Sequence, residues 1–344
     1  MIYYIESKYN DPYHNLAMEQ YIFDHFDRQN SYFMLWQNHN AIIVGKYQNT
    51  REEINAAFVK EKNIIVARRL SGGGAVYHDL GNINFTFITD AEPAAEPEGR
   101  GSPPDNTTGI DFSVFCRPIQ NALCSFGVPV EISGRNDMTV DGKKISGNAQ
   151  YIKQNRIMHH GTILYDSDLG ILSQALKPGD DKIESKGIKS VQSRVCNIRP
   201  YMKTDMSTAD FWAALKTYMM AAFDMSEIEL TPGQNAAVEK LKSEVYSQWS
   251  WNYGNSPPYN IRKIRRIKGC GKIEILLDIE KGEKIKNITF YGDFFGNREP
   301  GELGNILMGH HLEYDEIKTA LKNVDISQYF RALDSETFLA LLFE

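Results

Sequence analysis

Short apolar runs separated by polar turns predict a chain in which strands and helices are mixed. Residues 41–44 and 64–66 are runs of β-branched and small apolar side chains, which is typical of buried strands. In residues 84–87 polar and apolar side chains alternate, as expected for a strand with one buried face. These strands do not alternate with helices in a regular βαβ rhythm, so we predict an α+β fold rather than a doubly wound parallel sheet.

The first helix is predicted close to the N-terminus. Asp11 is a residue type that caps helices, and Pro12 follows it at the first helical position. Met18, Ile22 and Phe26 then recur at a spacing of four residues. This period predicts a helix that buries one apolar side.

A hairpin is predicted in the middle of the chain. The dipeptide Asp141-Gly142 favours a two-residue turn, and it lies between the strand-like segments 138–140 and 144–146. A further apolar run at 157–164 predicts another strand nearby in the sequence.

A second unit is predicted after the turn-rich segment 252–258. It contains a hairpin of two apolar segments, 273–278 and 285–290. We therefore expect a catalytic domain over residues 1–250 and an accessory domain over residues 256–344.

The composition limits the class of protein. With 42% hydrophobic and 24% charged residues, the chain is typical of globular proteins. Its formal net charge of −6 argues against broad nucleic-acid binding. Four cysteines without a C-x-x-C pair indicate idle thiols in a reducing compartment. We read neither a signal peptide nor a membrane span, so we expect a cytoplasmic protein without nucleic-acid or membrane partners.

One segment departs from this ordinary composition. Residues 91–109 are rich in proline, glutamate and glycine, which cannot build an apolar core. The composition predicts a mobile loop there.

The strongest candidate for chemistry is a glycine run that follows the predicted strand at 64–66. Gly72, Gly73 and Gly74 follow Arg68 and Arg69 with two residues between. Glycines allow a close backbone approach that a Cβ atom would block, and arginines bind phosphate or carboxylate. Peptide N–H groups beside fixed cations form an anion site. The alternative is a plain turn between two strands with solvated arginines.

Other site types fit the sequence poorly. His159 and His160 are adjacent on a predicted strand, so their side chains diverge, and no Cys/His spacing supports zinc. The glycine run does not end in G-K-[ST], so it is not a Walker phosphate loop. A hydrolase triad of Ser71, His78 and Asp79 lacks the G-x-S-x-G turn.

Taken together, the ordered motifs resemble the lipoate–protein ligase A family, of the two-domain bacterial type within the biotin/lipoate ligase superfamily. Each motif is weak alone, but their set and order are specific and span almost the whole chain. The matching segments are R-R-x-S-G-G-G-A-V-x-H-D-x-G-N (68–82), G-R-N-D (134–137), D-G-K-K-I-S-G-N-A (141–149), H-H-G-T (159–162) and K-G-I-K-S-V-Q-S-R-V (186–195), with smaller matches at 11–19 and 36–38.

This resemblance implies a two-step reaction. Lipoate, the substrate, reacts with ATP and Mg²⁺ to give lipoyl-adenylate and pyrophosphate. The lipoyl group then passes to a lysine of apo lipoyl domains of 2-oxoacid dehydrogenases, or of the glycine-cleavage H protein. The implied fold is a mixed-sheet domain related to biotin ligases and class II synthetases, with a small C-terminal α/β domain.

The resemblance also implies roles for individual residues. Lys144 would be the catalytic residue, touching both the lipoyl carboxyl group and the phosphate, and Asp137 a candidate magnesium ligand. The implied ATP-binding residues are Arg69, Gly74, Ala75, Val76, Tyr77, Asn136, Asp137 and Lys144. The implied lipoate-binding residues are Trp36, Arg69, Ser71, Gly72, Gly73, His78, Lys144, His160 and Gly161. Because all these motifs precede or end at Val195, we expect activation of lipoate to need the large domain alone.

Two alternatives remain open on sequence grounds. An octanoyl or lipoyl transferase of the same fold would need a cysteine nucleophile and no ATP, and none of the four cysteines falls in 131–165. A protein that binds lipoyl-adenylate without catalysis would be a different class, and the retained Lys144 weakens that interpretation.

Overall fold

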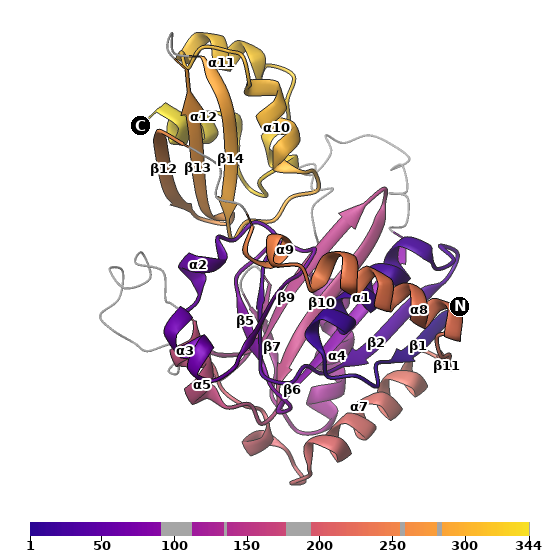
Figure 1. The fold of residues 1–344 in the computed structure, drawn as a ribbon. Helices are drawn as coiled ribbons and strands as arrows, with labels where there is room; N and C mark the ends of the chain where they lie inside the picture. The colour runs from indigo at the N-terminus through magenta and orange to yellow at the C-terminus, as the bar shows by residue number, and fades with distance from the viewer. Residues whose placement is uncertain (91–111, 134–135, 177–193, 255–258, 281–283, 344) are drawn as a thin grey trace, which may run out of the picture.

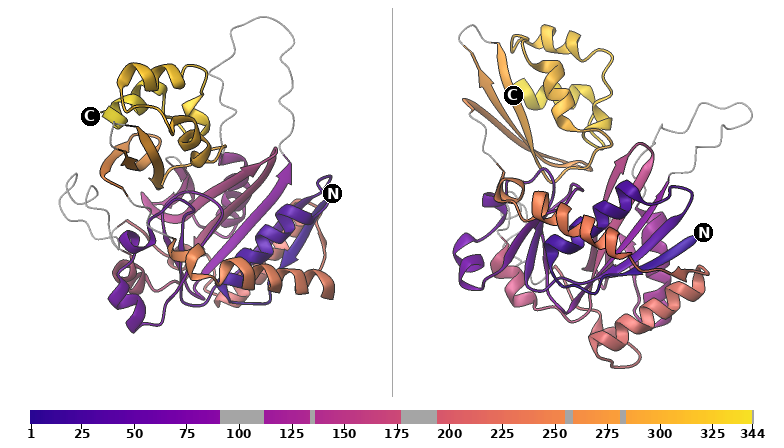
Figure 2. Two further views of the ribbon diagram at one scale, coloured as in Figure 1. Left: turned by 45° about the horizontal axis from the view of Figure 1, so that its top comes forward. Right: turned by 45° about the vertical axis from the view of Figure 1, so that its right-hand side comes forward.

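We describe the fold from a computed structural model, in which residues 1–90, 112–133, 136–176, 194–254, 259–280 and 284–343 are described. The chain forms a large domain, followed from Ile261 by a small one that stands at one end of it (Figures 1 and 2). The segment 91–109 and most of the 186–195 motif lie outside the described residues.

The centre of the large domain is an eight-stranded mixed sheet, with strand order β11-β1-β2-β6-β10-β9-β8-β7. β1 pairs in parallel with β2 and β11, and the remaining neighbours are antiparallel. The strands are β1 (Ile2–Glu6), β2 (Ser31–Trp36), β6 (Asn82–Asp90), β7 (Glu131–Ser133), β8 (Asp137–Val140), β9 (Lys143–Lys153), β10 (Arg156–Leu164) and β11 (Ser226–Glu227).

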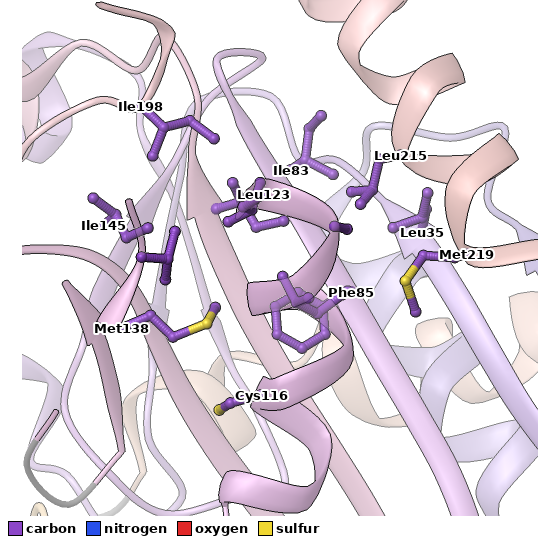
Figure 3. Packing of buried hydrophobic residues seen from close by; sticks show 14 of the residues in the cluster. Leu35, Ile83, Phe85, Cys116, Leu123, Met138, Ile145, Ile198, Leu215 and Met219 are labelled. Carbon is purple, nitrogen blue, oxygen red and sulfur yellow. The ribbon is translucent and has the colours of Figure 1, made fainter. Parts of the chain in front are cut away.

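Helices cover both faces of this sheet (Figures 1 and 2). Helices α1 (Pro12–His25) and α8 (Pro232–Leu241) pack together on one face, and α4 (Ser113–Ser125) and α7 (Thr208–Ala222) on the other. Alternation along β2 explains the two layers: Phe33 and Leu35 enter the core under α4 and α7, whereas Met34 enters the core under α1. Figure 3 shows the first of these cores around α4.

A smaller three-stranded sheet carries the glycine run. Its order is β4-β3-β5, formed by β3 (Ala41–Val44), β4 (Ile65–Arg68) and β5 (Val76–His78). β3 is parallel to β4 and antiparallel to β5, so the chain turns between β4 and β5 through the glycines. The remaining elements of the large domain are α2 (Thr50–Glu53), α3 (Ala56–Glu61), α5 (Leu169–Ala175), η2 (Arg199–Tyr201), η3 (Lys242–Tyr246) and α9 (Trp249–Tyr253).

The small domain is an antiparallel sheet with helices packed against it. The strands β12 (Ile261–Ile267), β13 (Gly271–Ile279) and β14 (Ile285–Gly292) lie in that order. The helices are α10 (Pro300–Leu307), α11 (Tyr314–Ala320), η4 (Ile326–Gln328) and α12 (Ser335–Phe343).

A short loop after β14 joins the two domains through side chains as well as backbone. Phe294 is fully buried in the core of the small domain, while Phe295 is buried in the core of the large domain. The Phe295 ring lies 5.4 Å from the Phe112 ring, measured between centroids. In addition, Arg262 of β12 lies 2.8 Å from Glu52 of α2.

Several local predictions are confirmed. Asp11 caps α1, accepting a hydrogen bond from the backbone of Tyr13, and Pro12 occupies the first turn. Asp141 and Gly142 have φ values of 51° and 72°, which is the backbone of a two-residue hairpin turn between β8 and β9. The α+β class with a mixed sheet is also confirmed.

The described residues hold no helix that is both long and apolar enough to cross a membrane.

Candidate active site

Arg69 is the buried centre of the glycine loop. Its guanidinium donates to the carbonyls of Ile43, Gly72 and Gly74 at 2.7–3.1 Å, and its Nε donates to Ser71 Oγ at 3.0 Å. Burial lowers the pKa of Arg69 to about 10, so the group stays charged at neutral pH. Arg69 therefore fixes the shape of the loop from within, because its donors hold the loop carbonyls in place.

The loop also depends on glycine where backbones approach closely. A Cβ atom at Gly45 would lie 2.0 Å from the carbonyl oxygen of Gly73, a contact that backbone cannot relieve. Gly73 itself has φ = 87°, in the region that favours glycine. The glycine run therefore adopts a backbone conformation that requires glycine, and it is not a plain turn that other residues could form.

A chain of hydrogen bonds links this loop to the central sheet. His160 Nδ1 lies 3.1 Å from Glu19 Oε1, and His160 Nε2 lies 2.6 Å from Ser71 Oγ. Because the Glu19 carboxylate can only accept, His160 Nδ1–H donates to it, and in the neutral ring Nε2 then accepts the Ser71 hydroxyl. Thr86 also donates to Glu19 and accepts from Trp36 Nε1 at 2.9 Å.

These hydrogen bonds connect the buried carboxylate of Glu19 to the buried guanidinium of Arg69 through His160 and Ser71. Glu19 is 1% exposed and Arg69 is 6% exposed. The Glu19 carboxylate favours the charged form of Arg69, opposing the effect of burial on the arginine pKa. The site is therefore electrostatically set by residues from α1, β10 and the glycine loop, three segments far apart in the sequence.

His78 stands beside Trp36, with ring centroids 5.9 Å apart. Asn38 Nδ2 lies 3.1 Å from His78 Nδ1, so that nitrogen accepts and Nε2 carries the proton. Burial and the nearby Arg69 lower the pKa of His78 to about 3. His78 is therefore a neutral part of the site wall at physiological pH, and its buried Nε2 has no hydrogen-bond partner among the described residues.

Lys144 lies near the start of β9, opposite Thr139 of β8, and its side chain reaches Asp137 on the same strand. Its Nζ is 2.7 Å from Asp137 Oδ1, and both side chains are about one-third exposed. A Cβ atom at Gly147 would lie 2.8 Å from Lys144 Nζ, so glycine at that position makes room for the ammonium group. Asn136 holds the neighbouring chain by donating to the carbonyl of Asn148 at 2.6 Å.

Two adjoining cavities meet at this lysine. The first has a volume of about 300 Å³, and the apolar side chains of Leu16, Trp36 and Ile43 contribute to its wall. The second has a volume of about 530 Å³, and Leu164, Leu172 and Leu176 contribute to its wall. Of the described residues, nine line both cavities: Gly74, Ala75, Val76, Asp137, Lys144, Gly147, Thr162, Arg266 and Asp293.

Most of the expected site residues are brought together at these cavities. The first cavity is lined by Trp36, Arg69, Gly73, Gly74, Ala75, Val76, His78, Asn136, Asp137, Lys144, His160 and Gly161, and the second by Gly74, Ala75, Val76, Tyr77, Asp137 and Lys144. Ser71 and Gly72 line neither cavity. Ser71 instead forms a hydrogen bond with His160, which lines the first cavity. Gly72 packs against the small domain, because a Cβ atom there would lie 2.3 Å from the carbonyl oxygen of Phe294.

Other lining residues were not foreseen from the sequence. Asn84 lies in β6, within the predicted strand at 84–87, and Thr162 is the last residue of the H-H-G-T motif. The sequence therefore contained a local signal for each of these two residues. Arg266 and Asp293 belong to the small domain and lie outside the motifs, although Arg266 is part of a basic run at 262–268 that the sequence also offers as a surface for an acidic acceptor. Their presence extends the site beyond the motifs, all of which lie in the large domain.

A metal site built by protein groups alone is not found within the described ranges. No group of three or more His, Cys, Asp or Glu side chains converges there. Asp137 remains the carboxylate nearest Lys144, and a single carboxylate suits Mg²⁺ that is held mainly by phosphate and water.

Buried neutral histidines give the protein a predictable pH dependence. His78 and His159 both have lowered pKa values because of burial, and Gln150 and Asn148 occupy the two nitrogens of His159. Below about pH 6.5, the ordinary pKa of histidine, these imidazoles bind protons in the unfolded chain but stay neutral in the folded chain. The free energy of unfolding therefore falls as the pH falls. We expect the free energy of unfolding by urea to be about 2–3 kcal/mol lower at pH 5.5 than at pH 7.5.

Substitution separates this effect from that of other groups. His78→Gln removes one of the two titrating side chains, so the difference between the two pH values should shrink by roughly half. An unchanged difference in His78→Gln would contradict the assignment of the pH dependence to these imidazoles.

Comparison with known proteins gives the family. Residues 11–220 match the lipoyl protein ligase A/B catalytic domain, and residues 256–342 match the bacterial lipoate protein ligase C-terminus. The lipoate-protein ligase LplJ of Bacillus subtilis is 41% identical over 346 residues, covering the whole of both chains. This chain belongs to the lipoate–protein ligase family. Lipoate–protein ligase 1 of Staphylococcus aureus is 39% identical over 332 residues, covering 96% of this chain and 97% of its own.

Solved structures in this family share the fold. LipL1 of Plasmodium falciparum, in complex with lipoate, superposes with a TM-score of 0.76 at 23% identity, covering 99% of this chain and 97% of its own. A bi-partite archaeal lipoate protein ligase from Thermoplasma acidophilum, studied with its E2 lipoyl domain, gives a TM-score of 0.62 at 26% identity, covering 75% and 98%. A lipoate-protein ligase A bound with ATP gives 0.58 at 23% identity, covering 74% and 98%.

Proposed function

We propose that this protein is an ATP-dependent lipoate–protein ligase that forms lipoyl-AMP and pyrophosphate and then lipoylates a lysine of an acceptor protein. The observation that carries the proposal is the pair of cavities that share Lys144 and Asp137 in their walls. A ligase of this kind must bring a carboxylate and an α-phosphate together, and two cavities joined at a cation provide for that. Membership of the family supports the same conclusion.

The first cavity is assigned to lipoate. Its inner wall of Leu16, Trp36 and Ile43 suits the acyl chain, and neutral His78 adds no charge there. The carboxylate would then lie at the shared wall, beside Lys144. Trp36, Arg69 and His78 in its wall are almost fully buried, and a cavity wall that excludes water favours survival of a reactive adenylate.

The second cavity is assigned to ATP. Tyr77 and the leucine wall suit an adenine base, and Gly74, Ala75 and Val76 bring backbone to the shared wall. Mg²⁺ would arrive with the triphosphate, and Asp137 is the residue that would hold it. When bound, the ion supplies charge neutralisation of the phosphates.

In the first step the residues of the site stabilise negative charge and do not transfer a proton. A carboxylate oxygen of lipoate attacks the α-phosphorus, the bond to the bridging oxygen breaks, and pyrophosphate leaves with the electron pair. Two anions must approach each other, so the fixed ammonium of Lys144 lowers the barrier electrostatically. As a compact charge on a flexible stem, it can follow the oxygen from carboxylate to mixed anhydride.

In the second step the acceptor lysine amine attacks the lipoyl carbonyl, and AMP leaves as the amide forms. Apo lipoyl domains of 2-oxoacid dehydrogenases and the glycine-cleavage H protein are the proposed acceptors, which matches the E2 lipoyl domain studied with the archaeal relative. In this proposal, residues 1–250 form the catalytic domain and residues 256–344 the accessory domain.

The acyl-enzyme alternative is disfavoured by the cysteines. None of the four lines either cavity, and Cys116 and Cys270 are buried. The backbone N–H of Cys196 donates to the carbonyl of Lys144 at 3.0 Å, but burial raises the pKa of its thiol. A raised pKa disfavours the thiolate that a transferase mechanism needs.

The decisive experiment measures the mass of an apo lipoyl domain after incubation with the protein, lipoate, Mg²⁺ and either ATP or no nucleotide. We expect one lipoyl group to be added with ATP only. Addition from an acylated carrier protein without ATP would select the transferase, and binding of lipoyl-adenylate without any transfer would select the non-catalytic binding protein.

A further inference from the structure

The wall where the two cavities meet includes residues of the small domain. Arg266 of β12 and Asp293, just after β14, line both cavities together with Lys144. With lipoate and ATP assigned to the two cavities as above, residues that line both lie where the two substrates meet. The sequence motifs alone predict that activation needs only the large domain.

Arg266 is held in this position by a defined set of contacts. Its Nη1 lies 3.3 Å from Asp293 Oδ2, and Asp293 Oδ1 accepts the backbone N–H of Lys272 at 2.5 Å. The loop that carries Asp293 is docked on the glycine run, because the N–H of Gly73 donates to the carbonyl of Phe294 at 3.3 Å. The position of Arg266 is thereby tied to the same loop that walls the cavities.

The cationic side chains extend from the wall shared by both cavities into the second cavity. At the shared wall, Lys144 is paired with Asp137 and Arg266 with Asp293. Lys272 lines the second cavity but not the first, and it lies 3.5 Å from Glu52. The cations thus continue from the shared wall into the cavity assigned to ATP, which is the direction that a triphosphate would take.

We propose that Arg266 binds the β- and γ-phosphates of ATP and stabilises them as pyrophosphate leaves, an inference that rests on the function proposed above. A guanidinium presents several N–H donors in a planar fork that matches phosphate oxygens. Negative charge grows on the leaving pyrophosphate as the bond from the α-phosphorus to the bridging oxygen breaks. A cation placed there lowers the barrier of that step, while Lys144 serves the carboxylate and the α-phosphate.

This role is confined to activation. In the transfer step the pyrophosphate has gone, and the acceptor amine displaces AMP from the lipoyl carbonyl. Arg266 has no group to stabilise in that step. The two half-reactions should therefore respond differently to its removal.

The test uses the full-length chain and measures both half-reactions separately. Arg266→Ala should reduce lipoate-dependent pyrophosphate release by roughly ten- to a hundredfold at subsaturating ATP, as expected for the loss of one charged phosphate contact. Transfer from synthetic lipoyl-adenylate to an apo lipoyl domain should stay within about twofold of wild type. Arg266→Lys, which keeps the charge but not the fork, should recover part of the loss.

Arg265→Ala is the matched control, because Arg265 is the neighbouring arginine on β12 and points to the other face of the strand. Both half-reactions should remain close to wild type in this variant. Normal pyrophosphate release in Arg266→Ala, an equal loss in Arg265→Ala, or an equal loss in both half-reactions would each overturn the proposal. Absence of pyrophosphate release by the wild-type protein would instead contradict the proposed function itself.

Discussion

Lys144→Ala is expected to reduce lipoate-dependent pyrophosphate release by at least about a hundred- to a thousandfold, the range seen when one preorganised group is removed from a developing negative charge. Lys144 lies in the wall shared by both cavities, so the loss affects the carboxylate and the phosphate together. Pyrophosphate release measured at saturating lipoate and ATP checks the prediction.

Loss of folding would not explain such a result. The Lys144–Asp137 pair is about one-third exposed at both side chains, so it contributes at most about 1 kcal/mol to stability. Lys143→Ala is the control, because Lys143 is exposed and points to the other face of β9. If Lys144→Ala released pyrophosphate at the wild-type rate, Lys144 would not be the shared contact of carboxylate and phosphate.

Glu19→Gln is expected to lower the free energy of unfolding by about 1–3 kcal/mol, because it weakens hydrogen bonds that the buried carboxylate accepts and removes a negative charge that favours charged Arg69. The substitution keeps the size of the side chain but removes the negative charge that supports buried Arg69. It also replaces one of the acceptors of His160 Nδ1–H and Thr86 with an amide group. Urea unfolding of the variant and the wild type measures the difference.

The same chemical change on the surface provides a control. Glu229 pairs with Lys8 at 2.7 Å, but both side chains are about 70% exposed or more. Glu229→Gln should therefore leave the free energy of unfolding close to that of the wild type. Equal losses of stability in the two variants would mean that the buried carboxylate of Glu19 contributes no more to the free energy of unfolding than an exposed carboxylate does.

Local patterns predicted the elements that depend on local chemistry. The Asp11–Pro12 start of α1 and the Asp141–Gly142 turn follow from capping and backbone preferences that a few residues decide. The apolar runs at 41–44 and 157–164 match β3 and β10. Of the residues that the motifs indicated for the site, all but Ser71 and Gly72 line at least one of the two cavities.

What the sequence could not supply is the pairing of distant segments. Glu19 lies in a motif, yet nothing local indicates that it meets His160, which is 141 residues away. The basic run in β12 reads locally as a solvated strand face, because lysine and arginine are usually exposed. Only the docking of the small domain brings Arg266 from that run to the cavities, and docking is a property of tertiary packing.

The loop after β14 has a consequence for how the protein unfolds. Phe294 and Phe295 are adjacent in the sequence, but they are buried in the cores of different domains. Full burial of a phenylalanine contributes about 1.5–3 kcal/mol, so melting of either domain removes that contribution from the other. The two domains should consequently melt in one calorimetric transition, and Phe295→Ala should separate it into two, because the loop would then lose the side chain that it buries in the core of the large domain.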